Sequence, residues 1–354
     1  MIQGGTSGIG ASVARSLAQR GAQIILLTQH PGSDPFLVDY IDDLRVQTAN
    51  DLIYAEQVDL SCLHSIRLFA TKWVDNAPPR RLDMVILCAS TMTPPLATTL
   101  HKTPDGMETN WAVNYLANFH LLSILSPAIR AQPPDRDVRV IMGTCASYIG
   151  AHLDLKDPLY TKRANTASKV YGASKLALMI FAQSFQKHLD AYQRPDKQPV
   201  NARVIVVDPG WTRTPGMRRY LTAGSLWGLF LYLVTWPFWW LVLKSPDRGA
   251  QSFLRAAMEA ELGIGVGGRM IKECREVAFA RTEVKDEKLA QELWKVSEEQ
   301  ITNLEREMAV KRALAKDKKG VSEEHESTRA GSSEQEEVSS KERKAGSRRS
   351  RKAK

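Results

Sequence analysis

A tyrosine and a lysine one helical turn apart are the residues of this sequence best suited to proton transfer. Tyr171 and Lys175 stand four positions apart at the start of a helical pattern, so both side chains lie on one helix face. An ammonium beside a phenol stabilises the phenolate, and we expect Lys175 to lower the pKa of Tyr171 from about 10. Tyr171 is the candidate general acid and base, with an exposed helical pair as the competing interpretation.

A glycine-rich turn at the start of the chain is the second feature that could do chemistry. The run Gln3-Gly4-Gly5-Thr6-Ser7-Gly8-Ile9-Gly10 leads directly into a helical pattern at Ala11. Backbone N–H groups and the positive end of the helix dipole converge at such a helix start, and the missing Cβ atoms let a diphosphate approach. The helix stop at Gly21 and the apolar run that follows favour this site over a flexible terminus.

Short apolar runs alternate with helical patterns and must position these residues. The runs 24–27, 84–87, 138–142 and 204–207 lack polar alternation, which is typical of strands buried on both faces of a parallel sheet. The pattern predicts a doubly wound, mainly parallel α/β sheet of Rossmann type with helices on both faces. Ligands bind such sheets at the carboxyl ends of the strands, which is where Thr144 and Pro209 stand.

Taken together, these residues resemble the short-chain dehydrogenase/reductase family over about residues 2–302. Gly4-x3-Gly8-x-Gly10 matches the cofactor turn of that family, and Tyr171-x3-Lys175 matches its acid–base pair. The segments 103–108, 113–116, 249–251, 268–274 and 293–297 resemble the microsomal retinol dehydrogenase branch, and the apolar run 226–243 resembles that of its fungal lipid-droplet relatives. The resemblance implies hydride transfer between a nicotinamide and a lipophilic alcohol or carbonyl.

The resemblance also implies roles for individual residues. Thr144 takes the position of the catalytic serine that polarises the substrate oxygen, with Ser147 as the alternative, and Asn114 orders a proton-relay water near Lys175. The residues implied to contact the cofactor are Gly4, Ser7, Gly8, Ile9, Gly10, Gln29, Asp59, Leu60, Ala89, Asn114, Tyr171, Lys175, Pro209, Gly210, Thr212 and Thr214. The segment 28–30, Thr-Gln-His, lacks the acid that binds the ribose of NAD, which favours NADP(H), with NAD as the alternative.

Three departures from the family pattern support a second hypothesis. Only Met1 and Ile2 precede the glycine turn, so the central strand is expected to be truncated, and unpaired ladder groups cost about 1–3 kcal/mol each. The family motif Asn-Ala-Gly is Cys88-Ala89-Ser90 here, and a threonine replaces the serine. The alternative is a catalytically degenerate scaffold at lipid droplets or membranes. Codons for an apolar strand upstream of Met1 would favour the enzyme.

An apolar segment at 222–244 interrupts the expected dehydrogenase domain. It is rich in tryptophan, contains Pro237, and has Arg218 and Arg219 before it and Lys244 at its end. Three interpretations compete: a spanning helix kinked at Pro237, a buried substrate lid, and an interfacial insertion that also covers the substrate site. Aromatic residues and flanking cations favour the interfacial insertion, through which a lipophilic substrate would enter from the lipid.

Composition and charge complete the prediction. We expect a Rossmann-type domain at 1–282, an amphipathic helix at 283–314 and a disordered charged tail at 315–354. This tail holds 12 Lys and Arg against 8 Asp and Glu, which is +4 of the net charge of +9, and we assign it neither nucleic-acid binding nor another function. Four cysteines without metal-binding spacing, and no apolar leader, predict a cytosol-facing protein without a metal. The resemblance and the apolar segment imply the lipid droplet or endoplasmic reticulum membrane as its location. A homo-oligomer is compatible with this.

Overall fold

One eight-stranded sheet organises the chain in the order β3-β2-β1-β4-β5-β6-β7-β8. All neighbouring strands pair in parallel except β7 and β8. The computed structural model describes residues 1–94, 100–157, 166–198 and 200–314. The strands are β1 Ile2–Gln3, β2 Ile24–Thr28, β3 Ile53–Gln57, β4 Met84–Leu87, β5 Val138–Gly143, β6 Ala202–Asp208, β7 Arg269–Lys272 and β8 Arg275–Val277.

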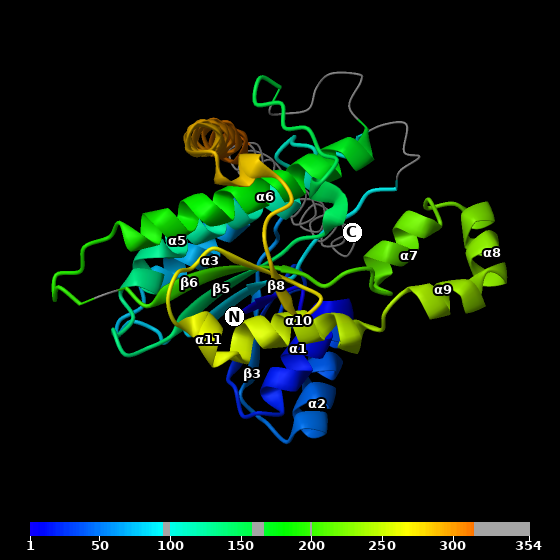
Figure 1. Cartoon of the computed structure of the whole chain (residues 1–354), viewed down its shortest axis with the longest axis horizontal. Helices are drawn as coiled ribbons and strands as arrows, with labels where there is room; N and C mark the ends of the chain where they lie inside the picture. The colour runs from blue at the N-terminus through cyan, green and yellow to red at the C-terminus, as the bar shows by residue number, and fades with distance from the viewer. Residues whose placement is uncertain (95–99, 158–165, 199, 315–354) are drawn as a thin grey trace, which may run out of the picture. The chain divides into compact units, whose positions relative to one another are not determined.

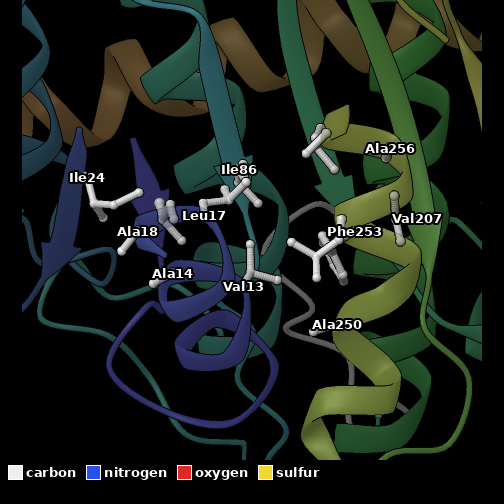
Figure 2. Packing of buried hydrophobic residues seen from close by; sticks show 14 of the residues in the cluster. Val13, Ala14, Leu17, Ala18, Ile24, Ile86, Val207, Ala250, Phe253 and Ala256 are labelled. Atoms are coloured by element: carbon white, nitrogen blue, oxygen red, sulfur yellow. The ribbon is translucent and has the colours of Figure 1, made fainter. Parts of the chain in front are cut away.

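Helices cover both faces of the sheet, as the alternating pattern predicts (Figure 1). One face carries α1 Gly8–Ala18, α2 Pro35–Thr48 and α10 Pro246–Met258, and the other carries α3 Leu63–Val74, α5 Ala117–Arg130 and α6 Ala167–Asp190. Figure 2 shows Val13 and Leu17 of α1 and Phe253 of α10 packing on the apolar strand residues. The shorter helical segments are α4 Thr109–Trp111, η1 Ala112–Leu116, η2 Ala146–Tyr148, α7 Pro215–Leu221, α8 Leu226–Val234, α9 Trp236–Val242, α11 Ala260–Gly263 and η3 Thr282–Lys285.

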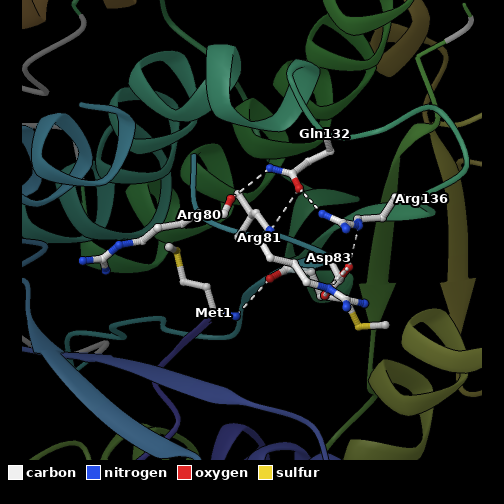
Figure 3. A network of polar contacts seen from close by, with 8 residues as sticks. Met1, Arg80, Arg81, Asp83, Gln132 and Arg136 are labelled. Carbon is white, nitrogen blue, oxygen red and sulfur yellow. Dashed lines mark hydrogen bonds and ion pairs between the residues drawn. The ribbon is translucent and has the colours of Figure 1, made fainter. Parts of the chain in front are cut away.

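The central strand is short, but it is paired on both sides. Ile2 of β1 lies opposite Leu26 of β2 and Ile86 of β4, and Gln3 lies opposite Leu27 and Leu87. The amino group of Met1 donates to the Met84 carbonyl at 3.0 Å, beside a network of Asp83, Arg136 and their neighbours (Figure 3). The expected truncation is therefore correct in length, and these two residues still complete the ladder before the glycine turn.

The fold domain extends beyond the predicted boundary at residue 282. Met1–Ile301 is one compact unit, and it includes the first half of a helix that covers residues 287–314. Trp294 packs edge-on against Phe119 at a ring separation of 5.1 Å, and Ser297 hydrogen-bonds the Tyr115 hydroxyl at 2.7 Å. A second unit begins at Thr302 and is helical to residue 314. The predicted tail at 315–354 lies outside the described residues.

The helices α7, α8 and α9, residues 215–243, form an extension that we call the apolar arm (Figure 1). The chain turns at Thr235, whose hydroxyl donates to Leu231 O and accepts from Trp239 Nε1, both at 2.7 Å. The single helix kinked at Pro237 that the sequence suggested is wrong, because Pro237 instead stands in the first turn of a new helix, where its missing N–H leaves no bond unmade. The nine residues of α8 span only about 14 Å.

Most of the arm is exposed, so it is not a buried lid. Leu226, Trp227 and Leu241 are each exposed by 80% or more, whereas Tyr232 is buried between α8 and α9. Among the described residues, one helical stretch, Thr109–Arg130, is long and apolar enough to cross a bilayer. Since 72% of its apolar window is buried inside the fold, that stretch is a core helix.

Candidate active site

A cavity of about 600 Å³ opens at the carboxyl ends of the central strands. Residues from the glycine turn, the loop after β4, the end of β5, α6 and the loop after β6 line it, although they are far apart in the sequence. The predicted site residues that line it are Gly4, Ser7, Gly8, Ile9, Gly10, Gln29, Ala89, Thr144, Tyr171, Lys175, Pro209, Gly210, Thr212 and Thr214. Asp59, Leu60 and Asn114 do not line it.

The glycine turn is built for a close approach of backbone. Gly4 and Gly8 have φ values of +67° and +55°, which L side chains rarely adopt. A Cβ on Gly10 would stand 2.2 Å from the Gly4 carbonyl oxygen, so only glycine closes the turn. The Ser7 side chain does not cap α1, and the first turn of that helix faces the cavity. Unpaired N–H groups and the helix dipole suit a diphosphate here.

Tyr171 and Lys175 both line the cavity from α6, as their spacing predicts. Lys175 Nζ lies 5.7 Å from the centre of the Tyr171 ring and donates to the Gly143 carbonyl at 3.3 Å. Burial, followed by the proximity of Cys145, raises the pKa of Tyr171 well above its usual value. Burial also lowers the pKa of Lys175. The expectation of a lowered tyrosine pKa is wrong for this structure, so Tyr171 holds its proton at neutral pH.

Cys145 and Ser90 both interact with the Tyr171 hydroxyl, and the role expected for Thr144 stays a prediction. Cys145 Sγ lies 3.3 Å from Tyr171 Oη. Thr144 Oγ1 is buried and has no hydrogen-bond partner among the described residues, although the residue borders the cavity. Ser147, the alternative, borders the cavity from an exposed position. A thiol therefore occupies the place opposite the tyrosine where a hydroxyl was expected.

Asn114 lies behind the cavity wall and holds the loop after β4. Its Oδ1 accepts from Thr91 N at 2.8 Å and from Ser90 Oγ at 3.1 Å. Its Nδ2 donates to Thr91 O at 2.9 Å and to Ser174 Oγ at 3.3 Å. This side chain thus ties the loop to α6, and the π-helical segment η1 presents it. The relay role suggested for Asn114 stays a prediction.

A buried carboxylate caps the helical stretch that carries Asn114. Glu108 accepts from Trp111 N at 2.8 Å and from Asn110 Nδ2 at 3.0 Å. Burial raises the pKa of Glu108 from 4.5 to about 7, so the folded chain binds this proton more tightly than the unfolded chain. Below about pH 4.5 the contribution of Glu108 to the free energy of unfolding is complete. This free energy falls by on the order of 3 kcal/mol as the pH rises towards about 7, because the unfolded chain loses the proton first.

Glu108→Gln keeps one of the two accepting oxygens and removes the titration. Its melting temperature should therefore fall less than that of the wild type between about pH 5 and about pH 8. Thermal unfolding at several pH values measures this, with the exposed Glu292→Gln as the control. If the melting temperatures of the wild type and of Glu108→Gln changed with pH by the same amount, the raised pKa of Glu108 would be contradicted.

The far end of the cavity bears on the choice between NAD and NADP. Gln29, at the end of β2, lines the cavity, while the neighbouring His30 pairs with Asp34 at 3.0 Å. Asp59 instead accepts from Ser61 N at 2.8 Å. Among the described lining residues none is Asp or Glu, whereas Lys175 and Arg219 are cations. The lining therefore favours a ligand with phosphate charge.

Several lining residues escaped the sequence prediction. Cys145, Ser90 and Phe253 line the cavity, as do Trp211, Met217 and Arg219 from the start of the apolar arm and the loop before it. Cys145 directly follows the predicted Thr144, so the sequence located the strand end but not the contact between Cys145 and Tyr171. A link between the cavity and the arm was expected, because the favoured interpretation of the apolar segment was an insertion that also covers the substrate site.

Comparisons with known proteins agree with this geometry. The short chain dehydrogenase family matches residues 1–141. The uncharacterized oxidoreductase pbr1 of Schizosaccharomyces pombe is 44% identical over 90% of this chain and 85% of its own length. Retinol dehydrogenase 13 and polyprenol dehydrogenase of Mus musculus are 30% and 33% identical over 83% of this chain, and 80% and 81% of their own lengths.

A solved structure supports the fold. The 3-oxoacyl (acyl-carrier-protein) reductase of Agrobacterium tumefaciens C58, solved with NADP bound, has a TM-score of 0.54 at 21% identity, covering 77% of this chain and 90% of the reductase. The chain belongs to the short-chain dehydrogenase family of oxidoreductases, which use nicotinamide cofactors. Both the predicted doubly wound fold and the predicted likeness to the retinol dehydrogenase branch are confirmed.

Proposed function

We propose that this protein is an NADP(H)-dependent oxidoreductase of lipophilic alcohols or carbonyls that works at a lipid surface. One observation carries the proposal: a single cavity joins the glycine turn, the Tyr171–Lys175 pair and the base of the apolar arm. The relatives named for retinol and polyprenol support a lipophilic substrate of retinoid, sterol or fatty aldehyde type.

The glycine turn fits the diphosphate of a dinucleotide, because the uncapped start of α1 faces the cavity. Gly8, Ile9 and Gly10 would hold the phosphates, and Gln29 would lie at the adenosine end. The absence of acids from the described lining supports NADP(H) over NAD. When bound, the nicotinamide supplies or accepts the hydride.

The protein's own contribution is proton transfer and orientation. Tyr171, protonated in this environment, is suited to donate its proton to a carbonyl oxygen and to take it back from an alcohol. Lys175 places a positive charge beside the phenolate that results. Asn114 keeps the loop bearing Ser90 against α6, so that the cavity wall stays in place.

The apolar arm supports a lipid surface as the partner. It exposes tryptophan, phenylalanine and leucine side chains, and Arg213 lies over the Trp240 ring at 5.5 Å. Cations beside an exposed aromatic face suit an anionic interface. Met217 and Arg219 of the same arm line the cavity, so substrate would enter from lipid. We place the enzyme on the cytosolic side of the lipid droplet or endoplasmic reticulum, with a homo-oligomer still to be tested.

The proposal is tested by cofactor-linked activity of the full chain with liposome-borne substrates. NADPH oxidation should occur with at least one of a retinal, a sterol ketone or a long-chain fatty aldehyde, and NADH should be the weaker reductant. NADPH fluorescence in a titration reports binding separately from turnover. Absence of both binding and turnover would favour the scaffold hypothesis.

A further inference from the structure

The end of β5 turns two neighbouring side chains to different environments. Thr144 is 4% exposed, and its hydroxyl is buried without a partner among the described residues. Cys145 follows in an extended conformation, with φ −158° and ψ 167°, immediately before η2. It is half-buried, and it lines the cavity. Both residues line the cavity, and the cysteine is the one of the two whose side chain lies within hydrogen-bond distance of Tyr171.

One contact ties the Cys145 thiol directly to the acid–base pair, and a second anchors the lysine of that pair to the backbone close by. Cys145 Sγ lies 3.3 Å from Tyr171 Oη, within the range of a hydrogen bond to sulfur. Lys175, one turn further along α6, is anchored to the carbonyl of Gly143, two residues before Cys145. Lys175 Nζ also lies 5.7 Å from the centre of the Tyr171 ring, whose hydroxyl the thiol contacts. The thiol, the phenol and the ammonium are therefore neighbours.

We propose that Cys145 is the third polar side chain of the catalytic centre, positioning the Tyr171 hydroxyl and hydrogen-bonding the substrate oxygen. This inference rests on the proposed function. Because S–H is a weaker donor than O–H, its main effect is to hold the tyrosine proton in line with the substrate oxygen. It also places a modifiable sulfur at the catalytic centre.

Matched substitutions at positions 144 and 145 test the assignment. Cys145→Ala should lower kcat by about 10²-fold with a small change in KM, since one donor to a reacting oxygen contributes about that much. Cys145→Ser restores a donor and should stay within about tenfold of the wild type. Thr144→Val should lose less than Cys145→Ala. NADPH binding by each variant shows whether the site is still folded.

Modification by a thiol reagent distinguishes a catalytic role of Cys145 from a purely structural one. Methyl methanethiosulfonate transfers its CH₃S group to the sulfur, the thiol proton is lost, and methanesulfinate leaves. The wild type should lose activity in step with labelling of Cys145, located by mass spectrometry, and NADPH should slow the labelling. Cys145→Ser should keep its activity under the same treatment. Cys88, also in the cavity wall, should react slowly because burial strongly raises its pKa.

The outcomes separate the two proposals. A wild type that neither binds NADPH nor turns over any substrate would overturn the proposed function itself. An active wild type whose Cys145→Ala variant is equally active would overturn only the role of Cys145, as would a larger loss in Thr144→Val. Inactivation by the reagent that persists in Cys145→Ser would place the sensitive sulfur elsewhere.

Discussion

Replacing Tyr171 by phenylalanine should lower kcat by about 10³-fold or more while NADPH binding is retained. The substitution removes one oxygen from a buried α6 side chain, and the phenyl ring keeps its packing beside Lys175. A positioned general acid contributes about 10²–10⁴-fold, and no Asp, Glu, His or second Tyr stands among the described residues that line the cavity. Initial rates of NADPH oxidation with the best substrate of the panel measure the loss.

Tyr54→Phe is the matched control, because Tyr54 is exposed on the edge strand β3. Its activity should equal that of the wild type. The raised pKa of Tyr171 adds a pH test, since carbonyl reduction needs the protonated phenol and should persist into alkaline solution. Substantial activity in Tyr171→Phe would reject Tyr171 as the proton donor.

The fold was predictable wherever a strand is buried on both faces. The runs that became β2, β4, β5 and β6 are uninterrupted apolar stretches, and their positions were found to within about two residues. The strands β3 and β8 were missed, because β3 has exposed positions and β8 consists of Arg275, Glu276 and Val277. Edge strands need little apolar burial, so their sequences lack the uninterrupted apolar run that marks a strand buried on both faces.

The location of the site could be predicted from the sequence, whereas the side-chain contacts and the pKa of Tyr171 could not. Glycine spacing, the Tyr171–Lys175 pair and the strand ends locate the cavity, because parallel strands bring their carboxyl ends to one edge. Which of Thr144 and Cys145 faces Tyr171 depends on one backbone turn after β5, for which the sequence holds no periodic signal. Likewise, the pKa of Tyr171 depends on burial within the folded structure, and its spacing from Lys175 does not report that burial.

The apolar arm allows the second large effect to be predicted. Trp227→Glu combined with Leu241→Glu should weaken binding to anionic liposomes by roughly 10²-fold or more. These two side chains, on α8 and α9, are 81% and 80% exposed, and burying each in lipid is worth about 1.5–3 kcal/mol. Co-sedimentation with phosphatidylcholine–phosphatidylserine vesicles measures the affinity, with Val46→Glu on α2 as an equally exposed control.

The same variant separates an interfacial arm from a lid. If the arm only docks the enzyme, the double variant should lose activity on vesicle-borne substrate and keep it on a short, water-soluble aldehyde, because neither side chain lines the cavity. If the arm instead closes over the substrate, both activities should fall together.

High salt should weaken binding of the wild type to vesicles only partly, since the contribution of Arg218 and Arg219 is screened whereas apolar insertion is not. Vesicle binding that survives the double substitution would contradict a lipid-facing arm.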